Sequence, residues 1–539
     1  MAPITQSEGK SENEQLAEVP REVIQFICYF KKVVDSKDVA EIQVLYEQGF
    51  SEVNEKHYQD KFWPEPNLIH TVISEPKSIF MILYREIYYR DIYMKTNTKG
   101  LSLSNRFDAF MNYQDLFAEI LNIKDDQPLD LVLPDVWLWD IIDEFIYQFV
   151  SYCNYKANPS HRSIEESHDL EDIEAQQSCW NIYPVLNILY SLLSKAQINQ
   201  QLKAIREGLN PDDIADQFGR SDLYFKLGYF SLIGLLKIHV LLGDYHQALQ
   251  TVEFLEMDPK GLYNTVPNCY VNLHYYVGYS HMMMRNYGEA TKIFVTCLLY
   301  IQKTTTLYKV HNSNVQRKYN PMDFIIKVKD QMLALLCICL ALQPQKIDES
   351  VLGALNDKHS DAYKSMSNGD LEEFKNCFLV GSPKFISPTV VAYEGASQVR
   401  GALIRQCNAF LEGLKGQIWL PVLRGYLKLY TSISVKKLAG FLNIPDNKLD
   451  DFIPKLLSFK MIVNELGKET TTGDDRIIEL DDSTLDLDFY VHNDTIHVAN
   501  TRVARKVTEF FLNNSLKLES IIDKAASISI KPPKTNKFK

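Results

Sequence analysis

The chain has 539 residues, of which 46% are hydrophobic and 23% charged, and its formal net charge is -12. This composition is that of a folded protein with several domains or one long repeat array, and it indicates neither a disordered nor a membrane protein. The negative charge argues against a surface that grips nucleic-acid phosphates over its whole area, so any such contact has to be local.

The first 20 residues are polar and acidic and lack the apolar stretch of a signal peptide. We expect residues 1–20 to be disordered and the protein to be cytoplasmic. The longest apolar stretches, 232–242 and 332–342, are shorter than the roughly 20 residues that cross a bilayer, so we expect buried helices and no membrane contact. Nine cysteines without a CxxC pair predict buried thiols in a reducing compartment.

Residues 21–156 are predicted to be a helical N-terminal region. After the start signal Pro134-Asp135, six apolar residues recur at the spacing of one helix face: Leu138, Ile141, Ile142, Phe145, Ile146 and Phe149. Residues 157–179 follow, with six acids against one arginine and few apolar side chains. We expect this stretch to be an acidic linker or surface loop and to mark a domain boundary.

Residues 180–343 have a helical pattern almost throughout, and two of their segments are alike. Segments 235–255 and 275–295 each place a tight turn before Tyr-x-x-Ala, which aligns Tyr245 with Tyr287 and Ala248 with Ala290 at a spacing of 42 residues. A small residue lets two helices cross closely while the aromatic ring fills the groove, so we predict stacked helical hairpins similar to degenerate tetratricopeptide repeats. Such arrays favour a scaffold over a catalyst.

Residues 344–415 are predicted to be helical, and residues 417–500 to form a winged helix that completes a domain spanning 344–500. Three short helices are expected at 421–430, 434–442 and 446–459, with Ser434 as the cap of the second. The segment 487–500 alternates apolar and polar residues around Asn493-Asp494, as a β-hairpin does.

The third of these helices would enter a DNA groove, but its charges argue against that use. It carries Lys448 and Lys455 against Asp446, Asp450 and Asp451. Because duplex affinity rests on neutralised phosphates, we expect a protein-contact module and no DNA binding.

A closing helix is predicted at 501–525, with one apolar side made of Val503, Val507, Phe510, Phe511, Leu518 and Ile521. This stripe predicts contact with a partner helix or, alternatively, packing back onto the repeats. The basic tail 526–539 contains Lys531, Lys534, Lys537 and Lys539, which either contact RNA weakly or only solvate a disordered end.

Motifs of catalysis are missing from the sequence. It contains no G-x-S-x-G elbow, phosphate-binding loop, G-x-G-x-x-G turn after a strand or HExxH helix. His274 and His281 are two helical turns apart without a carboxylate or cysteine to complete a metal site, so packed histidines are expected. We predict a mainly α, non-enzymatic protein without cofactor or metal.

Helical hairpins that run into a winged helix are the arrangement of PCI domains, and ISVKKLAGFLNIPDNKLDDFIPKLLSFKMI resembles the signature part of that module. The blocks LWDIIDEFIYQFVSYCNYK, YFKLGYFSLIGLLKIHVLLGDYHQAL, NLHYYVGYSHMMMRNYGEATKIF and FLVGSPKFISPTV resemble the family of L subunits of translation initiation factor three. The resemblance runs from about residue 20 to about residue 510.

The resemblance implies a scaffold in the octameric PCI/MPN core of that factor. Such a subunit would pair with the K subunit and other PCI subunits, associate with the small ribosomal subunit and support mRNA recruitment. It would use the wing at 488–499 and the stripe at 503–521, although the acidic insert at 466–486 could alter the wing's edge. The alternatives are a PCI scaffold of the proteasome lid or COP9 signalosome, or an RNA-binding helical-repeat protein.

Overall fold

The computed structural model describes residues 19–527 except 60, 74–77, 97–100, 122–126, 177–178, 256–260, 312–321, 394, 416, 419, 443, 446–448, 469–487 and 500. The chain is mainly helical, as predicted, and its only sheet among these residues has three short strands. The predictions for the leader 1–18, the insert at 469–487 and the tail from residue 528 lie outside the described residues.

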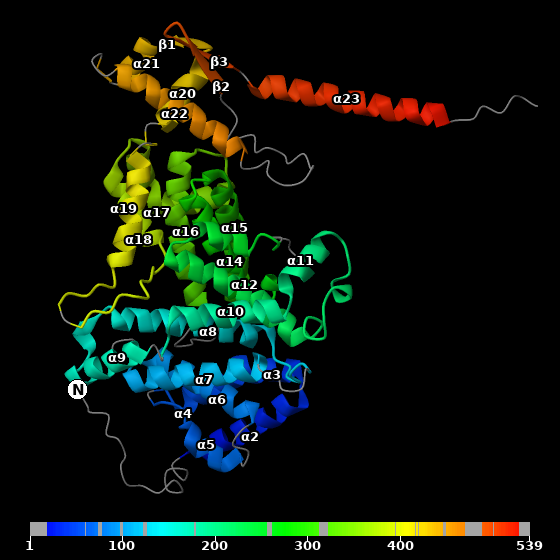
Figure 1. The fold of residues 1–539 in the computed structure, drawn as a ribbon, viewed down its shortest axis with the longest axis vertical. Coiled ribbons are helices and arrows are strands. Elements are labelled where there is room, and N and C mark those ends of the chain that lie inside the picture. The colour runs from blue at the N-terminus through cyan, green and yellow to red at the C-terminus, as the bar shows by residue number, and fades with distance from the viewer. Residues whose placement is uncertain are drawn as a thin grey trace, which may run out of the picture.

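The N-terminal helices form one end of the molecule, as Figure 1 shows in blue and cyan. They are α2 (Arg21–Ser36), α3 (Val39–Val44), α4 (Phe50–His57), α5 (Pro66–Ile73), α6 (Ile79–Lys95), α7 (Leu103–Leu121) and α8 (Asp135–Lys156). A single π-helical turn, Leu45–Gly49, joins α3 to α4. The predicted face of α8 is confirmed, because all six of its apolar residues are at most 2% exposed.

The middle of the chain continues as paired helices stacked beyond α8 (Figure 1). They are α9 (Ile164–Gln176), α10 (Ile182–Lys195), α11 (Ile198–Arg206), α12 (Asp222–Leu242), α13 (Tyr245–Thr251), α14 (Pro267–Met283), α15 (Tyr287–His311), α16 (Met322–Leu342), α17 (Glu349–Ser367), α18 (Leu371–Gly381) and α19 (Gly401–Lys415). Helix α12 packs against α8, α10 and α14, and α16 against α15, α17 and α18. One hydrophobic core therefore runs from Val23 to Leu414.

The expectation of a linker or loop at 157–179 is wrong for its central part, which is helix α9. Its start is a capping box, because Glu166 N donates to Ser163 Oγ at 3.0 Å and Ser163 N to the Glu166 carboxylate at 3.2 Å. Leu170 is completely buried and anchors the helix. Glu174 ties the helix to α8, since its carboxylate accepts from Lys156 Nζ at 2.9 Å and from the Tyr152 hydroxyl at 2.8 Å. A buried leucine, the capping box and this ion pair therefore hold a helix rich in acidic residues.

The helical region predicted at 344–415 contains α17, α18 and α19, but the described residues of 382–398, which lie between α18 and α19, form neither helix nor strand. Pro383 and Pro388 disfavour helix in the residues before them. The segment joins distant helices through its backbone: Ile386 N donates to Leu241 O at 3.1 Å and Ala392 N to Lys156 O at 3.0 Å. It thus ties the end of α8 to the end of α12.

Helix α12 is longer than the apolar run predicted within it, with 21 residues. By length and composition it is the one described helix that could cross a membrane, but most of it is buried inside the core. Its apolar character is explained by neighbours on several sides, namely α8, α10, α13 and α14.

A small unit follows the main body and has its own core (Figure 1). It consists of α20 (Leu420–Leu429), β1 (Ser432–Ser434), α21 (Val435–Phe441), α22 (Leu449–Lys468), β2 (Asp488–His492) and β3 (Thr495–Ala499). The strands are antiparallel in the order β1-β3-β2, with Ile433 opposite Ile496 and Val491 opposite Ile496. Helix α23 (Thr501–Ser527) then projects away from the rest of the chain.

The predicted three helices and hairpin of this unit are confirmed as elements. Ser434 caps α21 by accepting from Lys437 N at 3.4 Å, and Asn493 and Asp494 have φ of 47° and 58°, the left-handed values of a two-residue hairpin turn. Strand β1 was not predicted, because three residues are too few for an alternating pattern. Helix α22 runs nine residues beyond its predicted end at Phe459.

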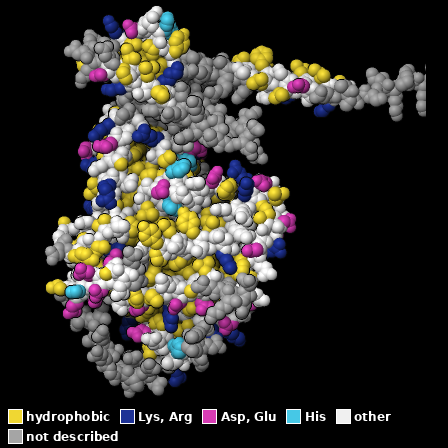
Figure 2. Space-filling model, in the orientation of Figure 1, with side chains coloured by type: hydrophobic (Ala, Val, Ile, Leu, Met, Phe, Trp, Pro, Cys, Tyr) yellow, Lys and Arg dark blue, Asp and Glu magenta, His cyan; other side chains and the backbone are white. Residues whose placement is uncertain are grey.

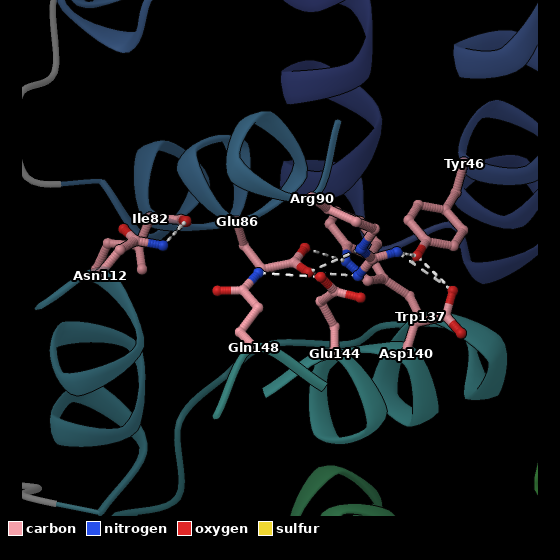
Figure 3. A network of polar contacts seen from close by, with 9 residues as sticks. All are labelled: Tyr46, Ile82, Glu86, Arg90, Asn112, Trp137, Asp140, Glu144 and Gln148. Carbon is pink, nitrogen blue, oxygen red and sulfur yellow. Dashed lines mark hydrogen bonds and ion pairs between the residues drawn. The ribbon is translucent and has the colours of Figure 1, made fainter. Parts of the chain in front are cut away.

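A buried polar network joins α6 to α8 inside the N-terminal core (Figure 3). Glu86 is completely buried, and its carboxylate accepts from Arg90 Nε at 3.1 Å and from Trp137 Nε1 at 3.3 Å. Arg90 also reaches Asp140, with 3.3 Å between Nη1 and Oδ2, and Asp140 accepts from the Tyr46 hydroxyl at 2.7 Å. The network thus gathers several acids around one arginine.

This network contains more carboxylates than positive charges. Arg90 therefore offsets only part of the rise in their pKa values that burial causes. Burial raises the pKa of Glu144 to about 7, although Arg90 and the hydrogen bond from Gln148 lower it. The pKa of Asp140 is raised to about 6, again mainly by burial. The folded chain therefore holds protons at neutral pH that an unfolded chain would release.

This proton uptake predicts a pH dependence that Glu144→Gln removes. The pKa of Glu144 in the folded chain lies above the ordinary 4.5. Its contribution to the free energy of unfolding is therefore fully present below pH 4.5 and is lost as the pH rises through about 7. Since Glu144 is half-buried, we expect E144Q to be more stable than wild type by about 1 kcal/mol at pH 8, and the difference to vanish towards pH 4.5. Urea unfolding followed by tryptophan fluorescence measures it, and a pH-independent difference would contradict the assignment.

Candidate protein interface

Helix α23 carries an apolar stripe that stays exposed in the part of the chain that the structure describes. Its predicted residues Val507, Phe510, Phe511, Leu518 and Ile521, together with Ile522, are between 48% and 65% exposed. At 100° per residue these side chains fall within one side of the helix. Figure 2 shows hydrophobic side chains exposed along the projecting helix. Val503 lies in the first turn of α23, where its side chain is not described.

The same helix has a second, smaller apolar face. Leu512 and Leu516 are four residues apart and about 60% exposed, on the side opposite the stripe. Sequence reasoning missed this pair because it sought one stripe, although the i, i+4 spacing of two leucines was a usable signal. Burying both faces needs neighbours on two sides of α23, as in a bundle of three or more helices.

The predicted wing, 488–499, lies at one side of the small unit. Among the described residues, β2 pairs with β3 alone and is therefore an edge strand. Its Tyr490 is 56% exposed and stacks on His497 with 5.0 Å between the ring centroids. Leu457 and Met461 on α22 are exposed as well. This unit therefore offers an open strand edge and exposed apolar side chains.

The four residues predicted to pack the repeats lie at the starts of two helices. Tyr245 and Tyr287 are the first residues of α13 and α15, and Ala248 and Ala290 are completely buried one turn later. Helix α13 follows α12 after a tight turn and packs against it, and α15 follows and packs against α14 in the same way.

Both tyrosines also reach the region of α19, which the sequence did not reveal. The Tyr245 hydroxyl lies 2.9 Å from the Gln406 side chain, and the Tyr287 hydroxyl lies 3.1 Å from that of Gln417. The matched tyrosines thus connect two successive hairpins to the last helix before the small unit.

Glycines allow the close approaches in this array. Gly243 ends α12 with φ of 89°, a conformation that favours glycine. Gly278 in α14 lies under the ring of Phe294 from α15, and a Cβ there would come within 2.5 Å of that ring. The α14–α15 hairpin therefore depends on a residue without a side chain.

Reactive groups are not gathered into a site. Among the described residues no cluster of three or more His, Cys, Asp or Glu side chains could hold a metal ion. Eight of the nine cysteines are buried thiols. His274 is buried, with Nδ1 2.9 Å from Tyr270 O and its ring stacked on Tyr270, and burial lowers its pKa. The predicted tail lysines, Lys531, Lys534, Lys537 and Lys539, lie outside the described residues.

The chain is similar to known proteins over almost its whole length. The family model described as RNA polymerase I-associated factor PAF67 matches residues 105–518. Eukaryotic translation initiation factor 3 subunit L of Caenorhabditis elegans is 54% identical over 96% of this chain and 94% of that protein. The subunit L protein of Aedes aegypti is 41% identical over 93% of this chain and 92% of that protein. The subunit L protein of Xenopus laevis is 37% identical over 97% of this chain and 94% of that protein. The chain belongs to the eukaryotic translation initiation factor 3 subunit L family.

Proposed function

We propose that this protein is a non-catalytic scaffold subunit of the cytoplasmic translation initiation factor 3, supporting its assembly on the small ribosomal subunit and mRNA recruitment. Family membership supports the assignment to this factor. The scaffold role is supported by a long helical array without a gathered set of reactive side chains among the described residues.

In this proposal the helices α10 to α16, within residues 180–343, are tetratricopeptide-like repeats. Residues 344–500 form a PCI domain, and the small unit is its winged helix. The order helix, strand, helix, helix, hairpin in 420–499 supports the second assignment. The exposed edge of β2 would pair or pack with a neighbouring PCI subunit.

The exposed stripe of α23 is the observation that carries the proposal. A 27-residue helix whose apolar side chains lie on two faces and are left exposed by the described residues has little reason to persist alone in water. It gains stability when partner helices bury those faces. We assign it to a bundle with other subunits of the factor, the K subunit foremost.

Deleting residues 503–539 tests this role. The three hydrophobic clusters of the described residues all end before the deletion, the last of them at Ile496, so the truncated chain is expected to stay folded and soluble. We expect it to lose co-purification with the other subunits when tagged chains are isolated from cells. Recovery of those subunits at the level of the full chain would contradict the bundle assignment.

A further inference from the structure

One stretch of this acidic chain contains basic residues and no acidic ones. Between Gly413 and Pro445 the sequence contains Lys415, Arg424, Lys428, Lys436 and Lys437 and no Asp or Glu, whereas the whole chain has 69 acidic against 57 basic residues. The stretch includes α20, β1 and α21, which are consecutive elements of the small unit. The stretch itself is basic, and the exposed Asp494 lies beside it in space, since its carbonyl accepts from Val435 N at 2.9 Å.

Aromatic rings lie on the same two helices. Tyr426 of α20 stacks on Phe441 of α21 with 5.2 Å between centroids and 22° between planes, and Tyr430 lies 6.2 Å from Phe441 at 26°. Phe441 is 37% exposed, and both tyrosines are half-buried. The three rings make a nearly parallel stack whose Phe441 member faces solvent in part.

A lysine lies beside these rings. The Lys437 ammonium is 5.3 Å from the centre of the Tyr430 ring and 5.9 Å from that of Phe441. Lys436 and Lys437 are exposed, and within the described part of the chain neither forms an ion pair with a carboxylate. Figure 2 shows hydrophobic side chains gathered on this unit, with both basic and acidic side chains around them.

Stacked aromatic rings flanked by cations are what a single-stranded nucleic acid needs. A base can stack on an exposed ring whatever its sequence, and the neighbouring phosphates are neutralised by lysines. A folded protein partner would favour the apolar faces elsewhere, whereas a lipid surface would need a larger cluster of charges around a membrane-inserting helix.

We propose that the α20–α21 face, defined by Tyr426, Tyr430, Phe441, Lys436 and Lys437, binds single-stranded RNA. The aromatic stack holds bases, and the two lysines hold the backbone phosphates. This contact is separate from the α23 stripe and from the tail lysines, and it adds to the proposed function without depending on it.

Fluorescence anisotropy with the full chain and a labelled single-stranded RNA of about ten nucleotides tests the proposal. We expect the Lys436→Ala/Lys437→Ala double variant to bind about tenfold more weakly and to reduce the slope of log affinity against log salt concentration by about 1.4. Phe441→Leu keeps an apolar side chain but removes the ring, and we expect about fivefold weaker binding with an unchanged salt slope.

The matched control is Lys31→Ala/Lys32→Ala, which removes an adjacent lysine pair from α2 and the same charge. It is expected to bind RNA like the wild type, and so is a chain ending at residue 525, without the basic tail. Equal binding by all variants would overturn the proposal, and loss of binding only on tail removal would assign RNA to the tail. If the Lys436/Lys437 variant binds RNA like the wild type but no longer co-purifies with another subunit, this face is a protein contact and not an RNA site.

Discussion

Replacing Phe511 and Leu518 by aspartate is expected to release the chain from the initiation factor while leaving its own fold intact. Both side chains are more than 60% exposed on the stripe of α23, so the change costs the isolated chain little. Inside a helix bundle, each new carboxylate would be buried without a partner, which costs several kcal/mol. We therefore expect the affinity for the other subunits to fall by more than about 100-fold.

The control places the same charges on the polar side of α23. Asn513 and Ser520 are exposed and lie away from both apolar faces, so Asn513→Asp/Ser520→Asp should co-purify like the wild type. Quantitative recovery of the other subunits on each tagged variant is the measurement. If the stripe and control variants are recovered alike, the stripe does not carry the assembly.

Replacing Arg90 by alanine is expected to cost about 3–5 kcal/mol of stability in the N-terminal core. Glu86 is completely buried, and Arg90 is the cation that its carboxylate contacts among the described residues. Without that guanidinium the carboxylate keeps only the Trp137 hydrogen bond at 3.3 Å. A buried charge with one neutral partner must either unfold the site or take up a proton.

The double variant Glu86→Gln/Arg90→Met separates the loss of an interaction from the cost of an unpaired charge. Glutamine keeps an oxygen for the Trp137 N–H, and methionine fills part of the volume of arginine, so we expect most of the stability to return. Urea unfolding followed by fluorescence is suited to this core, because Trp63, Trp137, Trp139 and Trp180 all belong to it. A double variant as unstable as R90A would mean that packing, not charge, explains the cost.

The elements that sequence reasoning found have strong local signals. Helix α8 follows Pro134-Asp135 and repeats its apolar residues over three turns, and the β2–β3 hairpin is marked by Asn493-Asp494 between alternating residues. The two Tyr-x-x-Ala segments likewise mark the starts of α13 and α15. In each case the determinants lie within a few residues of one another.

The elements that it missed depend on residues far away in the sequence. Helix α9 has the composition of a loop, and it is held by the buried Leu170 and by the contacts of Glu174 with Lys156 and Tyr152 of α8. The irregular segment 382–398 is held by backbone bonds to Leu241 and Lys156, which no local pattern announces. Strand β1 forms through antiparallel pairing with β3, which lies more than 60 residues later in the sequence.

The candidate interface was predictable only in part. The α23 stripe can be recognised in the sequence from its periodicity. Its exposure depends on tertiary structure, because the sequence is equally compatible with packing of the stripe onto the repeats. The α20–α21 face joins Tyr426 and Phe441 across a turn and a strand, so its stack appears only once the small unit is folded.

The scaffold role can be tested by identifying the proteins that co-purify with the tagged full-length chain from cells. We expect the subunits of translation initiation factor 3, with the K subunit among the most abundant, and we expect their loss from a chain ending at residue 502. Recovery of proteasome-lid or signalosome subunits in their place, or of the initiation factor subunits with the shortened chain, would contradict it.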